Sequence, residues 1–390
     1  MKVYPNLFVG LKNIMRNKMK KKNLIVFGTR PEAIKMAPLV KMFQNDTRFI
    51  TKVCVTGQHR EMLDQVLLFF NIKPDYDLNL MKPNQNLYNL TSEVITGMKP
   101  ILESFQPDYV YVHGDTTTTM AASISGFYSG AKICHIEAGL RTHNMNSPFP
   151  EEMNRQVASR IASYHFAPTE KAKNNLLREN IDESKILITG NTVIDALLES
   201  IDRVSSLDNK EIAELNKVID FNKKILLVTG HRRENHGERF VNMCVALKEI
   251  AAKNNDIEIV YPVHLNPNVL KPVNDLLGEI NNIHLIKPLS YPSFVWIMKK
   301  SYLIITDSGG VQEEAPSLGK PVLVMRDTTE RPEAVDAGTV ILVGTDKNKI
   351  VQEATDLLHN KEKYNSMSEL RNPYGDGKAC GRIVEFINKN

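Results

Sequence analysis

The feature that most constrains the fold of this chain is a regular alternation of short apolar runs with longer segments of helical period. The runs are rich in Val, Ile and Leu, as at residues 109–112 and 257–261. Near-continuous apolar runs of this kind are typical of parallel strands that helices cover on both faces. The pattern therefore predicts an α/β chain built from doubly wound, Rossmann-like domains.

The apolar runs form two series, one in each half of the chain. The first series predicts strands at residues 24–27, 52–55, 109–112, 132–136, 165–167 and 185–188. The second predicts strands at residues 225–228, 257–261, 283–286, 303–306, 322–324 and 340–343. A polar stretch, residues 205–222, separates the series, and 390 residues exceed what one core usually fills. We therefore expect two domains that meet between residues 191 and 220 and face a central ligand-binding cleft.

Composition and charge exclude several classes of protein. Hydrophobic residues make up 42% of the chain, but no uninterrupted apolar stretch is long enough to cross a bilayer, so no membrane span is expected. The four cysteines are far apart and lack Cys-x-x-Cys spacing, which predicts reduced, buried thiols in a cytosolic protein. Residues 1–22 carry seven Lys or Arg and no acid, and the remainder is slightly acidic. We therefore expect a disordered basic extension and no nucleic-acid partner.

Charged side chains gather where the strands of the first series end. Arg30 and Lys35 follow the first strand and can meet an anion there. The segments 135–141 and 148–155 place carboxylates beside arginines, a combination that suits proton transfer at a carbon beside a developing negative charge. The alternative is a helix-capping region whose charges face water. The turn after the third strand adds Asp115.

Small residues mark a strand-to-helix turn in the second series. Ser308, Gly309 and Gly310 would let backbone N–H groups approach a diphosphate, although a glycine pair is also ordinary turn chemistry. Glu314 in the following helix can accept hydrogen bonds from ribose hydroxyls. Arg331 can neutralise phosphate, or it can pair with a nearby glutamate instead.

Several familiar sites are not supported. The sequence has no Gly-x-Gly-x-x-Gly after a strand and no Walker-type phosphate loop. His113 with Asp115, and His135 with Glu137, would share a strand face if their strands extended that far. Such pairs can bind a metal, but buried, hydrogen-bonded histidines are the favoured interpretation, and no metal site is predicted.

Several motifs taken together resemble the non-hydrolysing UDP-N-acetylglucosamine 2-epimerases, and the resemblance runs in register from about Lys22 to the C-terminus. The motifs are residues 27–33, 56–60, 112–115, 135–141, 150–155, 229–235 and 306–310. The resemblance implies a GT-B-like fold, usually as a homodimer, with a domain at 23–195 that includes a returning helix at 373–390, and a UDP-binding domain at 196–372. It also implies reversible conversion of UDP-N-acetylglucosamine to UDP-N-acetylmannosamine, for cell-surface polysaccharide, with no cofactor and no obligatory metal.

The resemblance assigns roles to residues at matching motif positions. The chemistry that it implies is anti elimination of UDP to a 2-acetamidoglucal, followed by readdition of UDP after C2 is reprotonated from the other face. The implied catalytic residues are Asp115, Glu137, Glu151, Arg155 and His231. The implied UDP-binding residues are Arg30, Lys35, Phe294, Ser308, Gly309, Gly310, Glu314 and Arg331, of which Phe294 lies in a run apolar enough to be core.

Many bacterial members also bind a second UDP-N-acetylglucosamine as an activator. The residues in motifs that resemble this site are Gln58, His59, Gln85, Arg232 and His264. The match departs from the family pattern at Asn84 and Leu289, where some members carry arginine and glutamine. Activation is therefore a hypothesis for this chain.

Other functions stay open from the sequence. A hydrolysing relative would release free N-acetylmannosamine and UDP, and another relative would act on a more elaborated UDP sugar. A GT-B glycosyltransferase would use the same donor with an acceptor. The density of acids at Asp115, Glu137 and Glu151 counts against the glycosyltransferase.

Overall fold

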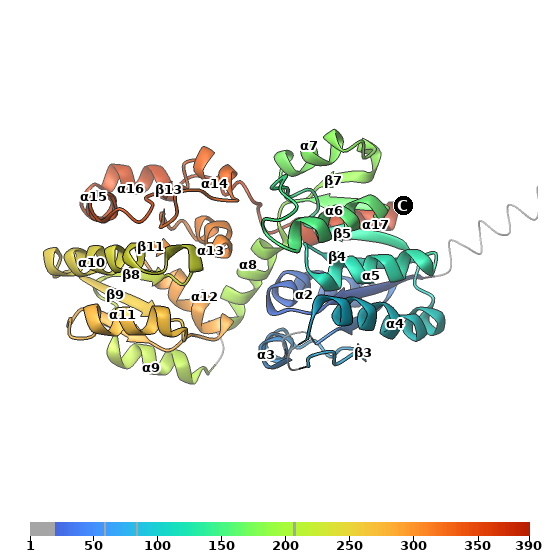
Figure 1. Ribbon diagram of the computed structural model, residues 1–390, viewed down its shortest axis with the longest axis horizontal. Coiled ribbons are helices and arrows are strands. Elements are labelled where there is room, and N and C mark those ends of the chain that lie inside the picture. The colour runs from blue at the N-terminus through green and yellow to red at the C-terminus, as the bar shows by residue number, and fades with distance from the viewer. Residues whose placement is uncertain (1–19, 58–59, 83–84, 206–207) are drawn as a thin grey trace, which may run out of the picture. The chain divides into compact units, whose positions relative to one another are not determined.

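A computed structural model describes residues 20–390 except 58–59, 83–84 and 206–207 (Figure 1). The chain divides into two compact units. The first contains the described residues up to Thr192 together with Lys378–Asn390, and the second spans Val193–Gly377. The second unit is thus inserted into the chain of the first.

The first unit is built on a seven-stranded parallel sheet with the order β3-β2-β1-β4-β5-β6-β7. Its strands are β1 (Lys21–Phe27), β2 (Phe49–Val55), β3 (Tyr76–Asp77), β4 (Tyr109–His113), β5 (Lys132–Ile136), β6 (Tyr164–Ala167) and β7 (Ile186–Ile188). Its helices are α2 (Arg30–Asn45), α3 (Arg60–Phe70), α4 (Leu87–Phe105), α5 (Thr117–Tyr128), α6 (Glu151–Ile161), α7 (Glu170–Arg178) and α17 (Ala379–Lys389).

The second unit has a six-stranded parallel sheet with the order β10-β9-β8-β11-β12-β13. Its strands are β8 (Lys224–Thr229), β9 (Ile257–Pro262), β10 (Ile283–Ile286), β11 (Leu303–Thr306), β12 (Val322–Val324) and β13 (Val340–Leu342). Its helices are α9 (Lys210–Val218), α10 (Glu238–Lys253), α11 (Pro267–Leu277), α12 (Tyr291–Lys300), α13 (Gly309–Glu314), α14 (Pro332–Asp336), α15 (Lys347–His359) and α16 (Lys361–Ser368), and α8 (Thr192–Val204) leads into the unit.

Apolar side chains on both faces of each sheet explain why helices cover the strands on both sides. Leu24, Ile25, Val26 and Phe27 in β1 are all fully buried, because successive residues pack against helices on opposite sides. In the first unit α4, α5 and α6 pack side by side, as do α3, α2 and α17 (Figure 1). In the second unit α10 packs between α11 and α15. Two doubly wound parallel sheets confirm the predicted α/β fold class.

The first strand begins earlier than the sequence predicts. Lys21 and Lys22, assigned to a disordered extension, belong to β1 and pair with Phe49 and Ile50 of β2. Their ammonium groups find local acceptors, since Lys21 Nζ donates to the Ile387 carbonyl at 2.7 Å and Lys22 Nζ to a carbonyl at the end of α4 at 3.1 Å. Residues 1–19 of the predicted extension lie outside the described residues.

The C-terminal helix packs on the first sheet. Phe386 of α17 meets the rings of Tyr164 and Phe166 edge-on at centroid distances of 5.1 and 5.6 Å. Arg382 donates to the carbonyl of Thr189 at 2.9 Å. The helix begins at Ala379 rather than at 373, because the preceding residues include a proline and two glycines with positive φ.

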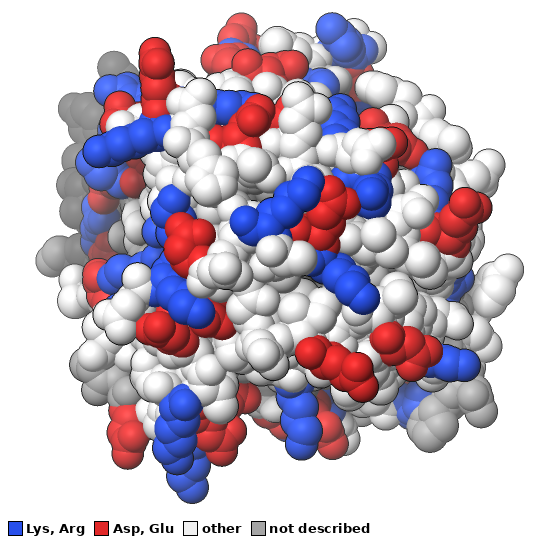
Figure 2. Space-filling model, turned by 90° about the vertical axis from the view of Figure 1, so that its left-hand side faces the viewer, with Lys and Arg blue, Asp and Glu red and all other residues white. Residues whose placement is uncertain are grey.

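The surface adds two observations. Figure 2 shows one face of the second unit, on which basic and acidic side chains are interspersed rather than gathered by sign. Within the described residues, no helix combines the length and apolar character needed to span a membrane.

Candidate active site

The turns after β4 and β5 bring two predicted catalytic carboxylates together. The strands are neighbours, and His113 at the end of β4 pairs with Ile136 at the end of β5. Gly114 then donates its N–H to the Ile136 carbonyl at 2.9 Å. The backbone of Gly114 and Glu137 has φ of 67° and 61°, a conformation that turns the chain sharply as each strand ends. Asp115 and Glu137 therefore both stand at the carboxyl edge of the first sheet.

Three polar side chains from separate segments of the chain lie around the Glu137 carboxylate. Lys35 of α2 forms an ion pair with Glu137 Oε2, and Asn191 donates to the same oxygen at 2.7 Å. His113 Nε2 lies 3.8 Å from it. Burial lowers the pKa of His113 to about 4, so the imidazole is neutral at neutral pH. Glu137 is thus held between one ammonium group and one amide.

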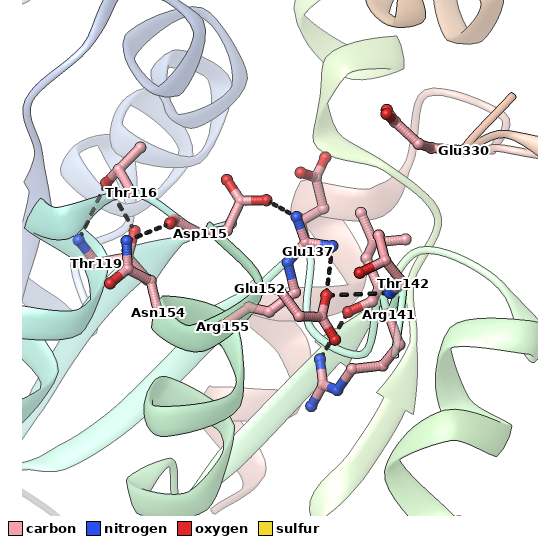
Figure 3. Close-up of polar contacts among 12 residues, drawn as sticks. Asp115, Thr116, Thr119, Glu137, Arg141, Thr142, Glu152, Asn154, Arg155 and Glu330 are labelled. Carbon is pink, nitrogen blue, oxygen red and sulfur yellow. Dashed lines mark hydrogen bonds and ion pairs between the residues drawn. The ribbon is translucent and has the colours of Figure 1, made fainter. Parts of the chain in front are cut away.

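Asp115 is held by α6. Arg155 Nη2 donates to Asp115 Oδ2, and Asn154 Nδ2 donates to the Asp115 carbonyl at 2.9 Å (Figure 3). Arg155 Nη1 also lies 3.5 Å from Glu152 Oε2. Glu152 in turn accepts the backbone N–H of Thr142 at 3.0 Å. The arginine therefore bridges two carboxylates, and one of them is anchored to the loop before α6.

The environment raises the pKa of Asp115. Burial is the main cause, and the nearby charges of Glu137 and Glu151 add to it, while Arg155 and Lys35 oppose it. Glu151 is the first residue of α6 and is half-buried. The structure thus brings both Glu137 and Glu151 within electrostatic reach of Asp115. Carboxyl groups in such unlike settings can divide the roles of proton donor and proton acceptor.

Arg30 and Lys35 both lie on α2, but only Arg30 stands in its first turn. Arg30 is half-buried and follows the N-cap Thr29. Lys35 is assigned to UDP by the resemblance, and in the structure its partner is Glu137, with only 13% of its side chain exposed. Lys35, which the sequence predicts to bind an anion, is thus paired with a carboxylate of the protein itself.

In the second unit, small residues follow β11 as predicted. A methyl group built on Gly309 would lie 3.3 Å from Arg331 Cζ, so the guanidinium rests directly against this turn. Arg331 Nε donates to Glu313 Oε1 at 2.9 Å, and Nη1 donates to Glu330 Oε2 at 3.0 Å. The intramolecular pair, one of the two alternatives for Arg331, is therefore present, and it holds the cation beside Gly309.

The resemblance assigns two further residues of the second unit, Glu314 and Phe294, to UDP. Glu314 Oε1 accepts the hydroxyl of Tyr291 at 3.3 Å, and both residues are buried. Phe294, on α12, is half-buried, whereas its neighbours Val295 and Ile297 are fully buried. Phe294 therefore does not belong to the core of the second unit.

His231 follows β8 and is held by a buried aspartate. The N–H groups of His231 and Arg232 each donate to Asp307 Oδ2 at 2.8 Å. The His231 ring stacks on that of His264, with centroids 5.3 Å apart and an interplanar angle of 14°. Burial lowers the pKa of His231, while the charge of Asp307 raises it.

The residues predicted for an activator site are found as follows. Gln58 and His59 lie outside the described residues. Gln85, in the first unit, donates to the Leu80 carbonyl at 2.8 Å. In the second unit, Arg232 lies 3.9 Å from Glu330, and the exposed His264 accepts the N–H of Asn266 at 3.1 Å.

The histidines do not form the pairs considered from the sequence. β4 ends at His113 and β5 ends at Ile136, so Asp115 and Glu137 lie in turns and share no strand face with a histidine. His135 Nε2 is bonded to the Gly114 carbonyl at 2.8 Å, as expected of a structural histidine. His113 Nε2 has no hydrogen-bond partner among the residues that the structure describes. Within that part of the chain, no group of three or more His, Cys, Asp or Glu is placed to hold a metal ion.

Three residues that hold the turns of the site have no role assigned from the sequence. Asn191 follows β7 and Asp307 follows β11, so both carry the same signal, a polar residue at a strand end, that identified Asp115. Glu32 completes a capping box with Thr29, a spacing visible in the sequence. Its other oxygen accepts the Thr116 hydroxyl at 2.7 Å, which ties the first turn to the residue after Asp115.

The chain is similar to known proteins over nearly its full length. Residues 41–388 match the family model of UDP-N-acetylglucosamine 2-epimerase. The chain is 60% identical to the UDP-N-acetylglucosamine 2-epimerase of Escherichia coli strain K12 over 371 residues, which cover 95% of this chain and 99% of the relative.

Solved structures give the same result. UDP-GlcNAc 2-epimerase from Neisseria meningitidis, bound to UDP-GlcNAc, is 54% identical, with a TM-score of 0.86 and coverage of 95% of this chain and 100% of that one. UDP-GlcNAc 2-epimerase from Methanocaldococcus jannaschii, in complex with UDP-GlcNAc and UDP, is 35% identical, with a TM-score of 0.77 and the same coverage. The chain therefore belongs to the UDP-N-acetylglucosamine 2-epimerase family.

Proposed function

We propose that this protein interconverts UDP-N-acetylglucosamine and UDP-N-acetylmannosamine without net hydrolysis. The observation that carries the proposal is the cluster at the carboxyl edge of the first sheet, where Lys35 pairs with Glu137, Arg155 pairs with Asp115, and Glu151 lies within electrostatic reach of Asp115. Simple binding of a sugar does not require so many proton-transfer groups. The names of the relatives support the same substrate.

In the proposed reaction a carboxylate removes the C2 proton while the bond from C1 to the diphosphate oxygen breaks. The electron pair of the C–H bond forms the C1–C2 double bond, and UDP leaves with the electrons of the C–O bond. The products of this half-reaction are 2-acetamidoglucal and UDP. A second carboxyl then protonates C2 from the opposite face, and the UDP oxygen adds back to C1.

The contacts in the first unit suit these two roles. Glu137 is paired with Lys35, which favours a charged carboxylate that can accept a proton. Asp115, whose pKa burial raises, is better placed to hold and return a proton. Arg155 restrains the charge that builds up as protons move. We assign no carboxyl group to a particular face of C2.

We assign the UDP moiety to the second unit. The small side chains of Ser308, Gly309 and Gly310 leave room for a diphosphate against the backbone, and Arg331 lies beside them. Glu314 would bind the ribose hydroxyls. His231 would act at the diphosphate oxygen that leaves and returns. The polarised C1–O bond makes the weakly acidic C2 proton removable.

The decisive experiment follows the purified protein with UDP-N-acetylglucosamine in deuterated water by proton NMR. We expect UDP-N-acetylmannosamine to appear, with deuterium at C2 of product and returned substrate. Free N-acetylmannosamine with stoichiometric UDP would instead identify a hydrolysing enzyme. An unchanged spectrum would contradict the proposal and direct attention to more elaborated UDP sugars, and then to glycosyl acceptors.

Activation by a second molecule of UDP-N-acetylglucosamine is part of the proposal and has a separate test. The reaction is started from pure UDP-N-acetylmannosamine, and its progress curve is followed with and without a trace of the epimer. A lag that the trace abolishes would support activation. A linear progress curve from the first turnover would exclude it.

A further inference from the structure

The most distinctive polar contact outside the carboxylate cluster is between Asp307 and the loop that carries His231. Asp307 has no exposed surface and follows β11, the direct neighbour of β8. Thr306 pairs with Thr229 across these strands, and the N–H of Asp307 donates to the Thr229 carbonyl at 3.1 Å. The sheet register therefore places the Asp307 carboxylate beside the turn that begins after β8.

The two carboxylate oxygens of Asp307 differ in their hydrogen bonds. Oδ2 accepts the N–H groups of His231 and Arg232 at 2.8 Å each, and Asn235 Nδ2 lies 3.5 Å from it. Oδ1 has no hydrogen-bond partner within the described part of the chain, although it is buried. The His231 ring nitrogen Nδ1 lies 3.4 Å from Oδ1. A buried carboxylate oxygen without a donor is costly, and a proton on the nearby Nδ1 would let the ring donate to Oδ1 after a small approach.

The surroundings of His231 fix the ring further. It stacks on His264, so its plane is set by an aromatic neighbour as well as by Asp307. Its side chain is 45% exposed, which leaves the ring open to a ligand. When Nδ1 carries the proton, Nε2 is the nitrogen with the free lone pair. A carboxylate that fixes the tautomer and orientation of a histidine is a general device in active sites.

We propose that Asp307 is a positioning residue that holds His231 as the Nδ1–H tautomer and thereby presents Nε2 to the departing and returning diphosphate. This inference rests on the function proposed above, because that function gives His231 its task. Asp307 itself touches no reacting atom. It acts through the imidazole and through the backbone of the turn that carries it.

The first test measures the tautomer of His231 directly and does not depend on enzymatic activity. The full-length protein is labelled with ¹⁵N-histidine, and long-range ¹H–¹⁵N spectra are recorded near pH 8, where the imidazole is neutral. The His231→Gln variant identifies the signals of His231 by their loss. We expect the wild-type ring to be the Nδ1–H tautomer. An Nε2–H tautomer would overturn the proposal.

The second test is Asp307→Asn. If the amide oxygen keeps the two backbone N–H bonds, the NH₂ group faces Nδ1 and forces it to accept, so the proton moves to Nε2. We expect the tautomer to switch and kcat to fall about 30-fold, with KM changed less than about threefold. An unchanged tautomer, or an unchanged kcat, would overturn the proposal.

A double variant separates positioning from a structural effect. If Asp307 acts through His231, adding Asp307→Asn to His231→Gln should lower kcat by less than about twofold more. A full additional loss would show that Asp307 acts independently of His231 and would refute the proposal. Asp346→Asn is the matched control, because Asp346 also accepts one backbone N–H, from Lys349 at 2.7 Å, at the start of α15 in the same unit. It should leave both the tautomer and kcat unchanged.

The outcomes distinguish this inference from the proposed function. Wild-type protein that does not epimerise UDP-N-acetylglucosamine contradicts the function, yet the NMR tautomer still tests the contact between Asp307 and His231. Epimerase activity together with an Nε2–H wild-type ring contradicts only the role of Asp307. If Asp307→Asn does not fold, the wild-type tautomer still decides the question.

Discussion

The two units share a strand order, apart from a seventh strand at one edge of the first sheet, but use the carboxyl edge of the sheet differently. In each, the first strand of the unit lies inside the sheet, with the next two strands on one side of it and the later strands on the other. In the first unit the turns after β4 and β5 carry Asp115 and Glu137. In the second, the turn after β11 carries Ser308, Gly309 and Gly310. A shared topology thus supplies the location, and the turn residues supply the chemistry.

Charge is also managed differently in the two units. The first unit surrounds its carboxylates with cations from helices, Lys35 on α2 and Arg155 on α6. The second holds a cation, Arg331, with carboxylates at 2.9 and 3.0 Å. The first arrangement suits proton transfer, and the second suits an anion that can compete for a partly neutralised guanidinium. The following predictions test whether this division is real.

The largest effect is expected from Glu137→Gln. The amide cannot take a proton, so kcat should fall about 10³-fold. UDP binding, assigned to the second unit, should remain measurable by calorimetry. The control is Glu183→Gln, which removes a carboxylate from the pair with Lys173, where the Glu183 side chain is 69% exposed. Retention of more than about a tenth of wild-type kcat would remove Glu137 from the catalytic set.

A somewhat smaller effect is expected from Arg155→Gln. Without the guanidinium, the pKa of Asp115 should rise further, because burial remains and the opposing charge is lost. We expect kcat to fall about 100-fold and the limb of the pH–rate profile that reports Asp115 to move to higher pH. Arg160→Gln, on the same helix but exposed, is the control. A profile displaced to lower pH would contradict the assigned role.

Two alanine substitutions, at Gly309 and Gly310, test the assignment of UDP binding to the second unit. Ala at position 309 would place a methyl group 3.3 Å from the Arg331 guanidinium, whereas a methyl group at position 310 would approach Glu314 Oε2 no closer than 3.9 Å. We expect Gly309→Ala to weaken UDP binding about tenfold, and Gly310→Ala to weaken it less. Gly381→Ala, on α17 of the first unit, controls for the substitution itself, because its methyl group would meet only Met42 Cε at 4.0 Å. If Gly310→Ala weakened UDP binding more than Gly309→Ala, the contact with Arg331 would not be the cause of the weaker binding.

The smallest effect concerns stability rather than activity. Burial lowers the pKa of His113, His135 and His165 to about 4, 3 and 4, and all three belong to the first unit. In the unfolded chain these rings bind protons below about pH 6.5. In the folded protein they bind protons only when the pH falls to their lower pKa values. Stability conferred by the neutral rings is therefore lost as pH falls from about 6.5 towards 4, by up to about 1.4 kcal/mol per pH unit for each ring.

Hydrogen exchange by mass spectrometry at about pH 7 and about pH 5.5 checks this prediction. After correction for intrinsic rates, β4, β5 and β6 should lose more protection than β8 and β11. The raised pKa values of Glu32 and Asp115 offset part of the loss, because a folded state that holds extra protons gains stability in acid. His165→Leu should reduce the difference, and equal losses in both units would show that the buried histidines are not its cause.

The fold was largely predictable because its signal is local. Every predicted strand overlaps an observed one, since continuous burial on both faces requires apolar residues along the whole run. The exception among the observed strands is β3, only Tyr76–Asp77, which has too few residues to show a pattern and exists through its pairing with Cys54 and Val55. The start of β1 was also missed, because the polar Lys21 and Lys22 are recruited by pairing with β2.

The site was predictable in position but not in its contacts. Strand ends identify Asp115, Glu137 and Ser308, because ligands of open parallel sheets bind beyond the carboxyl ends of the strands. That Lys35 meets Glu137 depends on how α2 lies across the sheet, which no local pattern encodes. The same holds for Asn191, whose amide reaches Glu137 from the end of β7, a strand two places away from β5. Contacts of this kind follow from packing alone.

The return of α17 to the first sheet has a consequence for how the chain is made. The ribosome completes the second unit before it synthesises Phe386, whose ring covers Tyr164 and Phe166. Until then these rings lack that cover, and the nascent first unit exposes apolar surface while its neighbour can already fold. Chains whose synthesis stops within the last dozen described residues should therefore fail to complete the packing of the first unit while the second unit still folds. We expect the first unit to be the part of the chain that depends more on chaperones.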